Sequence, residues 1–168
     1  MKDTELKLIC ELIKNSRKSD RELAKSIGVS QPTISRVRSR LEKEVIMEYT
    51  MRPNLHKLGF QILAVTFAKL NPENQQNPKI LERAKDFVES HPNIMFASTG
   101  RGVHSDRLAV SIHKSYSDYS EFMQELKRDY GEFYTVTESF LVSLESDKIL
   151  RPMTLRALAD CLKEEKSE

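Results

Sequence analysis

The first part of the chain carries two short segments with the spacing of amphipathic helices. Between residues 3 and 15, apolar side chains recur every three or four positions, which predicts one helix through Leu6, Ile9, Leu12 and Ile13. Ser19 followed by Glu22 is typical of a capping box and predicts the start of a second, shorter helix. Gly28 suits the left-handed residue that ends such a helix.

A third helix is predicted to follow after a very short turn. Ser30 can cap it, and Pro32 lies in its first turn, where a missing N–H costs nothing. Its apolar stripe consists of Ile34, Val37 and Leu41. A short capped helix, a turn with glycine and a second helix of this length are typical of a helix-turn-helix.

The segment after the third helix alternates apolar and polar residues. Residues 45–52 include the β-formers Val45, Ile46, Tyr49 and Thr50, and Pro53 follows them. This pattern predicts a strand, and hence a wing beside the helix-turn-helix.

The rest of the chain alternates predicted strands and helices. We expect strands at 62–70, 94–99, 107–113 and 135–144, with helices at about 80–91 and 119–130. The order β-α-β-β-α-β predicts a ferredoxin-like domain with both helices on one face of an antiparallel sheet. The fold class is therefore α+β.

Two apolar surfaces lack an assigned partner. The first strand is apolar on both faces, with Leu63, Val65 and Phe67 on one and Ile62, Ala64 and Ala68 on the other, and two helices would cover only one of them. A second copy of the chain is the simplest cover. After Pro152, a final apolar stripe predicts a C-terminal helix that packs either on its own subunit or on a neighbour, through Leu155, Leu158, Ala159 and Leu162.

Charge is distributed unevenly over the 168 residues. Residues 1–60 hold 13 Lys/Arg against 8 Asp/Glu, a net of +5, and the remainder holds 14 against 17, a net of −3. A basic front part favours contact with a polyanion. No run of 18 apolar residues occurs and no apolar segment opens the chain, so we expect a cytoplasmic protein that does not enter the membrane. Two distant cysteines predict no disulfide framework.

The third helix has the side chains that duplex DNA requires. Three arginines and no acid lie between Ser30 and Arg40, among hydroxyl and amide groups that can contact phosphates and base edges. A solvated charged helix is the alternative, which the short capped helix before it makes less favourable. The predicted contacts to double-stranded DNA are Lys25, Ser30, Gln31, Thr33, Ser35, Arg36, Arg38, Ser39, Arg40 and Arg52.

Enzyme motifs are missing from the sequence. The four histidines occur singly, without metal-ligand spacing, and Gly100 and Gly102 follow a predicted strand but open no helix. We therefore predict no catalytic residues, no metal and no cofactor.

The chain resembles the Lrp/AsnC (feast/famine) transcription regulators in the order of three parts. These are a winged helix with the sequence ELAKSIGVSQPTISRVRSRLEKEVI, a linker that ends in LHKLGF, and a β-α-β-β-α-β domain. The resemblance implies a DNA-binding domain at 1–52, a linker at 53–60, a dimerisation and effector domain at 61–145, and a C-terminal helix and tail at 146–168. It implies sequence-specific binding to operator DNA as a homodimer or as a tetramer or octamer.

The resemblance also implies a small-molecule effector such as an amino acid. The positions that correspond to the effector loop are Gly100, Arg101, Gly102 and Asp106, in a loop that we expect to be longer than the family's short turn. The alternative within the same superfamily is an enzyme resembling siroheme decarboxylases, for which His56, His104, Arg101 and Arg107 would line a pocket.

Overall fold

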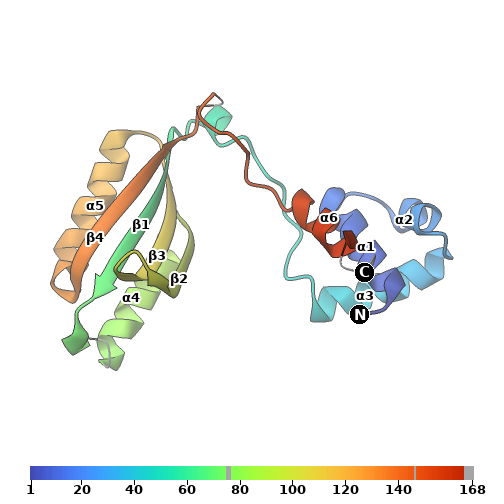
Figure 1. The fold of residues 1–168 in the computed structure, drawn as a ribbon, viewed down its shortest axis with the longest axis horizontal. Coiled ribbons are helices and arrows are strands. Elements are labelled where there is room, and N and C mark those ends of the chain that lie inside the picture. The colour runs from blue at the N-terminus through green and yellow to red at the C-terminus, as the bar shows by residue number, and fades with distance from the viewer. Residues whose placement is uncertain (75–76, 146, 165–168) are drawn as a thin grey trace. The chain divides into compact units, whose positions relative to one another are not determined.

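The chain folds into two compact units (Figure 1). The computed structural model describes residues 1–74, 77–145 and 147–164. Unit 1 combines residues 1–52 with the described residues from Pro152 onward, and unit 2 spans Pro53–Arg151. Unit 1 is therefore built from two separate stretches of sequence, and unit 2 lies between them along the chain.

Unit 1 contains the three predicted front helices, α1 (Asp3–Lys14), α2 (Asp20–Ile27) and α3 (Gln31–Glu44). The Ser19 hydroxyl accepts from the Glu22 amide, and the Glu22 carboxylate accepts from the Ser19 amide at 2.7 Å, so the predicted capping box is present. Gly28 ends α2 at φ 83°, a conformation that costs glycine little. The three helices enclose a core of Leu8, Leu12, Leu23, Ala24, Ile34, Val37 and Leu41.

The wing predicted at residues 45–52 is wrong, because this segment forms no strand. Ile46 packs on the unit 1 core, but Met47 is 99% exposed. A strand needs a neighbouring strand to pair its N–H and C=O groups, and the described residues of unit 1 offer none. Alternation and β-propensity therefore did not suffice to form a strand here.

The C-terminal helix α6 (Arg156–Glu164) packs on α1 within unit 1. Ala159 is fully buried against Leu6 and Cys10, and Lys14 forms an ion pair with Asp160 at 2.8 Å. Of the two partners that the sequence left open for this helix, the structure shows its own chain.

Unit 2 has the predicted β-α-β-β-α-β order. Its elements are β1 (Ile62–Leu70), α4 (Pro78–Ser90), β2 (Ile94–Gly102), β3 (Ser105–His113), α5 (Tyr116–Tyr130) and β4 (Tyr134–Ser143). Short 3₁₀ turns occupy His56–Leu58, Pro72–Asn74 and Gly131–Phe133. The four strands are antiparallel neighbours in the order β2-β3-β1-β4.

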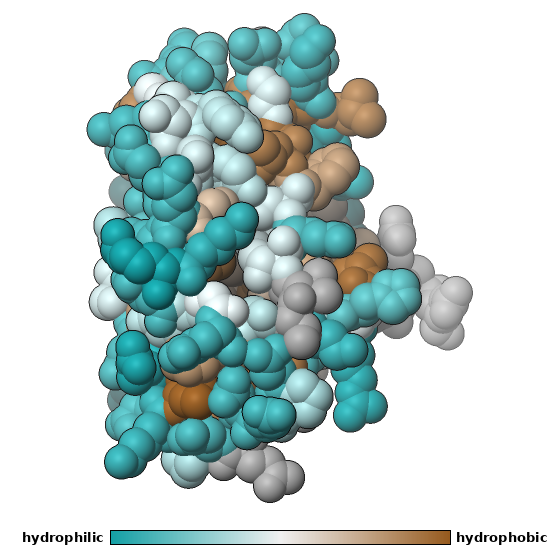
Figure 2. Space-filling view, turned by 90° about the vertical axis from the view of Figure 1, so that its left-hand side faces the viewer, coloured by the Kyte–Doolittle hydropathy of each residue, from teal (hydrophilic) through white to brown (hydrophobic). Residues whose placement is uncertain are grey.

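Helices α4 and α5 cover one face of this sheet (Figure 1). On that face Ala64, Ser111 and His113 are buried, and the His113 ring contacts Phe122 of α5. Phe122 in turn contacts Phe87 of α4. The surface of unit 2 seen from the left of Figure 1 is mostly hydrophilic, with small separate hydrophobic areas (Figure 2).

The other face of the sheet, which we call the open face, is apolar, and no described element of unit 2 covers it. The register aligns Val65 between Phe140 of β4 and Val110 of β3, and Phe96 of β2 lies next to Val110. Phe140 is 68% exposed and Phe96 is 54% exposed. The sequence predicted that one face would lack a cover, and the structure identifies it as the face of Leu63, Val65 and Phe67.

The turn between β2 and β3 is shorter than expected. The long loop predicted from Gly100 to Asp106 is wrong, because the strands continue to Gly102 and Ser105 and leave only Val103 and His104 between them. Both residues have positive φ, 44° and 57°, as the two central positions of a tight hairpin turn require. The usual Asn-Gly signal is not present here, which hid the hairpin from the sequence.

Acid is expected to destabilise unit 2 through His113. Burial is the main reason why the pKa of this histidine is lowered. The Asp118 carboxylate, 3.9 Å away, acts to raise this pKa, and the nearby His91 acts to lower it. Because the unfolded chain binds the proton more readily, stability is complete above about pH 6.5 and falls below it, by at most about 1.4 kcal/mol per pH unit.

Urea unfolding followed from pH 8 to pH 5 measures this effect, with His113→Gln expected to flatten the profile. The exposed His56→Gln serves as the control and is expected to leave the profile unchanged. An equal acid slope in the His113 variant would contradict the assignment.

Candidate nucleic-acid interface

Helix α3 presents an exposed polar face on the side opposite its core stripe. Ile34, Val37 and Leu41 are buried, whereas the opposite face carries exposed hydroxyl, amide and basic side chains. Its members are Gln31, Ser35, Arg36, Ser39 and Lys43. The 3.6-residue repeat thus places one candidate binding surface along the whole length of the helix.

The three arginines of α3 have different surroundings. Arg38 lies on the flank toward α2, where its guanidinium donates to Asp20 at 2.8 Å and to Glu42 at 3.2 Å. It also lies 5.3 Å from the ring centre of Tyr49. The hydrogen bond to Asp20 raises the pKa of Arg38 above its usual value. Arg38 therefore ties α3 to α2 and to the segment after α3.

Arg40 lies on the opposite flank and pairs with Glu5 of α1. The Glu5 carboxylate also accepts from the backbone N–H of Lys2 at 2.8 Å, and this hydrogen bond is the main reason why the pKa of Glu5 is lowered. Arg36, by contrast, is exposed and has no ion-pair partner among the residues that the structure describes. It is the one of the three arginines whose charge is left for a ligand.

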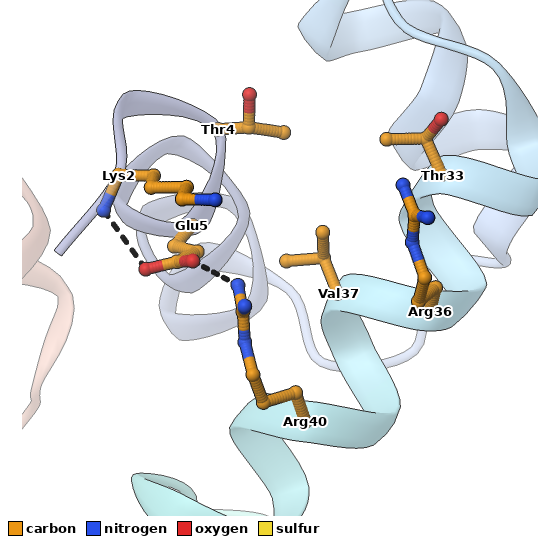
Figure 3. A pocket seen from close by; sticks show the side chains of 7 residues that line it. All are labelled: Lys2, Thr4, Glu5, Thr33, Arg36, Val37 and Arg40. Carbon is orange, nitrogen blue, oxygen red and sulfur yellow. Dashed lines mark hydrogen bonds and ion pairs between the residues drawn. The ribbon is translucent and has the colours of Figure 1, made fainter.

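A cleft of about 430 Å³ opens between the first turn of α1 and this flank of α3 (Figure 3). From the α1 side it is lined by Lys2, Thr4 and Glu5. From α3 it is lined by Thr33, Arg36, Val37 and Arg40. The cleft extends the exposed face of α3 toward the start of α1.

The remaining predicted DNA contacts lie at the ends of the helices. The Ser30 hydroxyl caps α3 by accepting from the Thr33 amide, and the two hydroxyls lie 2.8 Å apart. Lys25 is exposed in the last turn of α2. Arg52 donates to the carbonyl of Met153 at 3.1 Å, in the segment before α6.

The predicted effector positions lie together around the β2–β3 hairpin. Gly100, Arg101 and Gly102 are exposed in β2. Asp106 has another contact, because its carboxylate accepts from the Leu70 amide at 3.1 Å and lies 3.3 Å from Arg107. In this position Asp106 fastens the end of β1 to the start of β3.

Sequence reasoning missed Lys2, Thr4 and Lys43. Lys43 could have been found, since it follows Ser39 by four residues and Arg36 by seven, and such spacings share one helix face. Lys2 and Thr4 have no local signal, because only the packing of α1 against α3 brings them beside Arg36.

Two further findings concern other classes of protein. Across the described residues, no group of three or more His, Cys, Asp or Glu side chains is arranged to hold a metal ion. Within the same ranges, no helix is both long enough and apolar enough to span a membrane.

Comparison with known proteins agrees with this interface. Residues 1–44 match the winged helix-turn-helix DNA-binding family. The chain is 28% identical over 152 residues to an uncharacterised HTH-type transcriptional regulator of Pyrococcus furiosus, covering 89% of this chain and 97% of that protein. It is 34% identical over 89 residues to the transcriptional regulator LrpA of Pyrococcus horikoshii, covering 52% and 62% of the two proteins.

The solved structures show the same fold. A transcriptional regulator of Neisseria meningitidis, crystallised as a complex with L-Met, superposes with a TM-score of 0.76 at 17% identity, covering 94% of this chain and 99% of that one. The helix-turn-helix, the four-stranded sheet with two helices and the similarity to Lrp regulators agree with one another. The chain is similar to Lrp transcription regulators and shares the fold of Lrp and AsnC proteins.

Proposed function

We propose that this protein regulates transcription from the cytoplasm by binding operator DNA through the exposed face of α3. One observation carries the proposal: Arg38 and Arg40 are engaged within unit 1, while Arg36 has no ion-pair partner among the described residues and projects from the same face as Gln31, Ser35 and Ser39. An exposed helix with arginine, amide and hydroxyl groups can enter the major groove and contact base edges and phosphates.

The open face supports action as a homodimer. Soluble monomers rarely expose a continuous apolar surface such as the one around Val65, Val110 and Phe140. Pairing of two such faces would give a two-fold dimer whose α3 helices reach half-sites about 34 Å apart. Tetramers or octamers of this dimer are part of the same proposal.

A small-molecule effector such as an amino acid is proposed to act through unit 2. The regulator from Neisseria meningitidis that shares this fold was crystallised with L-Met. In this chain Gly100, Arg101 and Gly102 are exposed and available, whereas Asp106 contributes by holding the hairpin against β1. The relatives are named as transcription regulators, and a role without catalysis is proposed here on that basis.

The central test is replacement of the unpaired arginine. Arg36→Glu is expected to weaken binding to DNA from upstream of the protein's own gene by at least about tenfold, because loss of the arginine contact and repulsion of phosphate add together. Fluorescence anisotropy at 50 mM and 200 mM salt measures the change.

Lys127→Glu makes the same charge reversal on α5 and provides the matched control. If both variants bound upstream DNA as tightly as the native chain, the exposed face of α3 would have no part in binding. Addition of amino acids to the same titrations tests the effector.

A further inference from the structure

The cleft between α1 and α3 contains more positive charge than its own acid can balance. Four of the groups that line it are ionised: Lys2, Arg36 and Arg40 are cations, and Glu5 is the one anion. Glu5 is already occupied, since its carboxylate holds the Arg40 guanidinium and the Lys2 backbone amide. Glu5 also attracts the Lys2 ammonium, so three cations face one anion and the lining keeps an excess of positive charge.

These two cations are directed to the same space. The Lys2 side chain points from the start of α1 toward α3, and the Arg36 guanidinium lies on the other side of the cleft near Thr33, with Val37 between them (Figure 3). Neither cation has an ion-pair partner within the described part of the chain. Two like charges that face one cleft repel each other unless an anion is present.

The other groups in the cleft fit an anion with several oxygen atoms. Thr4 and Thr33 line its two sides, and the Thr33 hydroxyl keeps hydrogen-bonding capacity beyond its contact with Ser30. A guanidinium fork binds two oxygens of a phosphate, and an ammonium group acts on a third as a point charge.

We infer that this cleft binds one backbone phosphate of the DNA, held by Lys2, Thr4 and Arg36. The inference rests on the proposed function and adds α1 to the interface. The phosphodiester is favoured over a free anion because Arg36 belongs both to the cleft and to the exposed face of α3. Arg36 then fixes the position of the duplex, and Gln31, Ser35 and Ser39 are the side chains that contact base edges.

Neutralising both partners in turn tests the contact. In a series of otherwise identical duplexes, single phosphates are replaced by uncharged methylphosphonates, and each duplex is titrated with native protein and with Lys2→Met. One position is expected to weaken native binding but to have no further effect on Lys2→Met. The variant retains the backbone hydrogen bond to Glu5, so α1 is expected to keep its start.

Salt dependence gives an independent measurement. For Lys2→Met, the slope of log K against log salt is expected to be smaller by about one unit than that of the native protein. Affinity should therefore fall about fourfold less between 50 mM and 200 mM salt. Lys79→Met removes another exposed lysine, from unit 2, and is expected to keep the native slope.

The outcomes separate this inference from the proposed function. If the native protein binds DNA and Lys2→Met shows the native slope and the native methylphosphonate profile, the cleft has no phosphate in it and only the inference fails. A different result would be that inorganic phosphate, added at constant ionic strength, stabilises the native protein but not Lys2→Met, while every methylphosphonate weakens the binding of both proteins equally. The cleft would then bind a free anion, and the inference would be overturned. If native protein does not bind DNA, both fail.

Discussion

Phe140→Asp is expected to convert the proposed dimer into a 19.4 kDa monomer. Phe140 is the most exposed aromatic side chain of the open face, and it lies directly across from Val65 on the neighbouring strand. An aspartate there would have to be buried without a partner when two sheets meet, which costs several kcal/mol for each charge. Light scattering after size-exclusion chromatography measures the mass.

The effect on DNA binding should be larger still. A dimer binds two half-sites at once, and the second contact is effectively intramolecular, which commonly raises affinity by about 100-fold or more. Phe140→Asp is expected to lose this gain on a two-fold operator while keeping affinity for a single half-site. Gln124→Asp adds the same charge on the exposed side of α5 and should stay dimeric. A dimeric Phe140→Asp would place the subunit interface elsewhere.

Ala159→Arg is expected to release α6 from α1. Ala159 is fully buried against Leu6 and Cys10, so an arginine at this position has neither space nor a partner. Undocking exposes Cys10, which is 1% exposed in the native fold. A thiol reagent that reacts quickly only with the exposed Cys161 of native protein should then react quickly with two thiols.

The matched control for this release is Leu155→Arg. Leu155 is 71% exposed just before α6, so the same charge can be accommodated there in water. One fast thiol is expected for this variant, and unit 1 should unfold at the native temperature. Slow modification of Cys10 in Ala159→Arg would show that α6 does not depend on this contact.

The helices α1, α2 and α3 could be predicted from the sequence because the residues that start and end them act locally. Ser19 with Glu22, Gly28 at the helix end and Ser30 at the next start each act within four residues, and the structure confirms all three signals. The same holds for the strand order of unit 2, whose elements alternate at regular intervals. Patterns that are satisfied within one element are visible before the chain is folded.

Contacts between residues that lie far apart in the sequence could not be predicted from the sequence. Arg38 meets Asp20 across 18 residues and Arg40 meets Glu5 across 35, so three apparently equivalent arginines could not be told apart. The segment 45–52 has the composition of a strand but no neighbour within unit 1. The final helix has an apolar stripe that fits several partners, and only packing against α1 identified the one present.

The return of α6 to α1 also constrains how the protein is made. Because ribosomes synthesise the chain from its amino terminus, α1, α2 and α3 emerge long before residue 159, and all of unit 2 is translated in between. The cluster of Leu6, Cys10 and Ala159 can close only after all of unit 2 and residue 159 have been translated. A nascent or prematurely terminated chain would therefore carry a helix-turn-helix whose first helix is still uncovered.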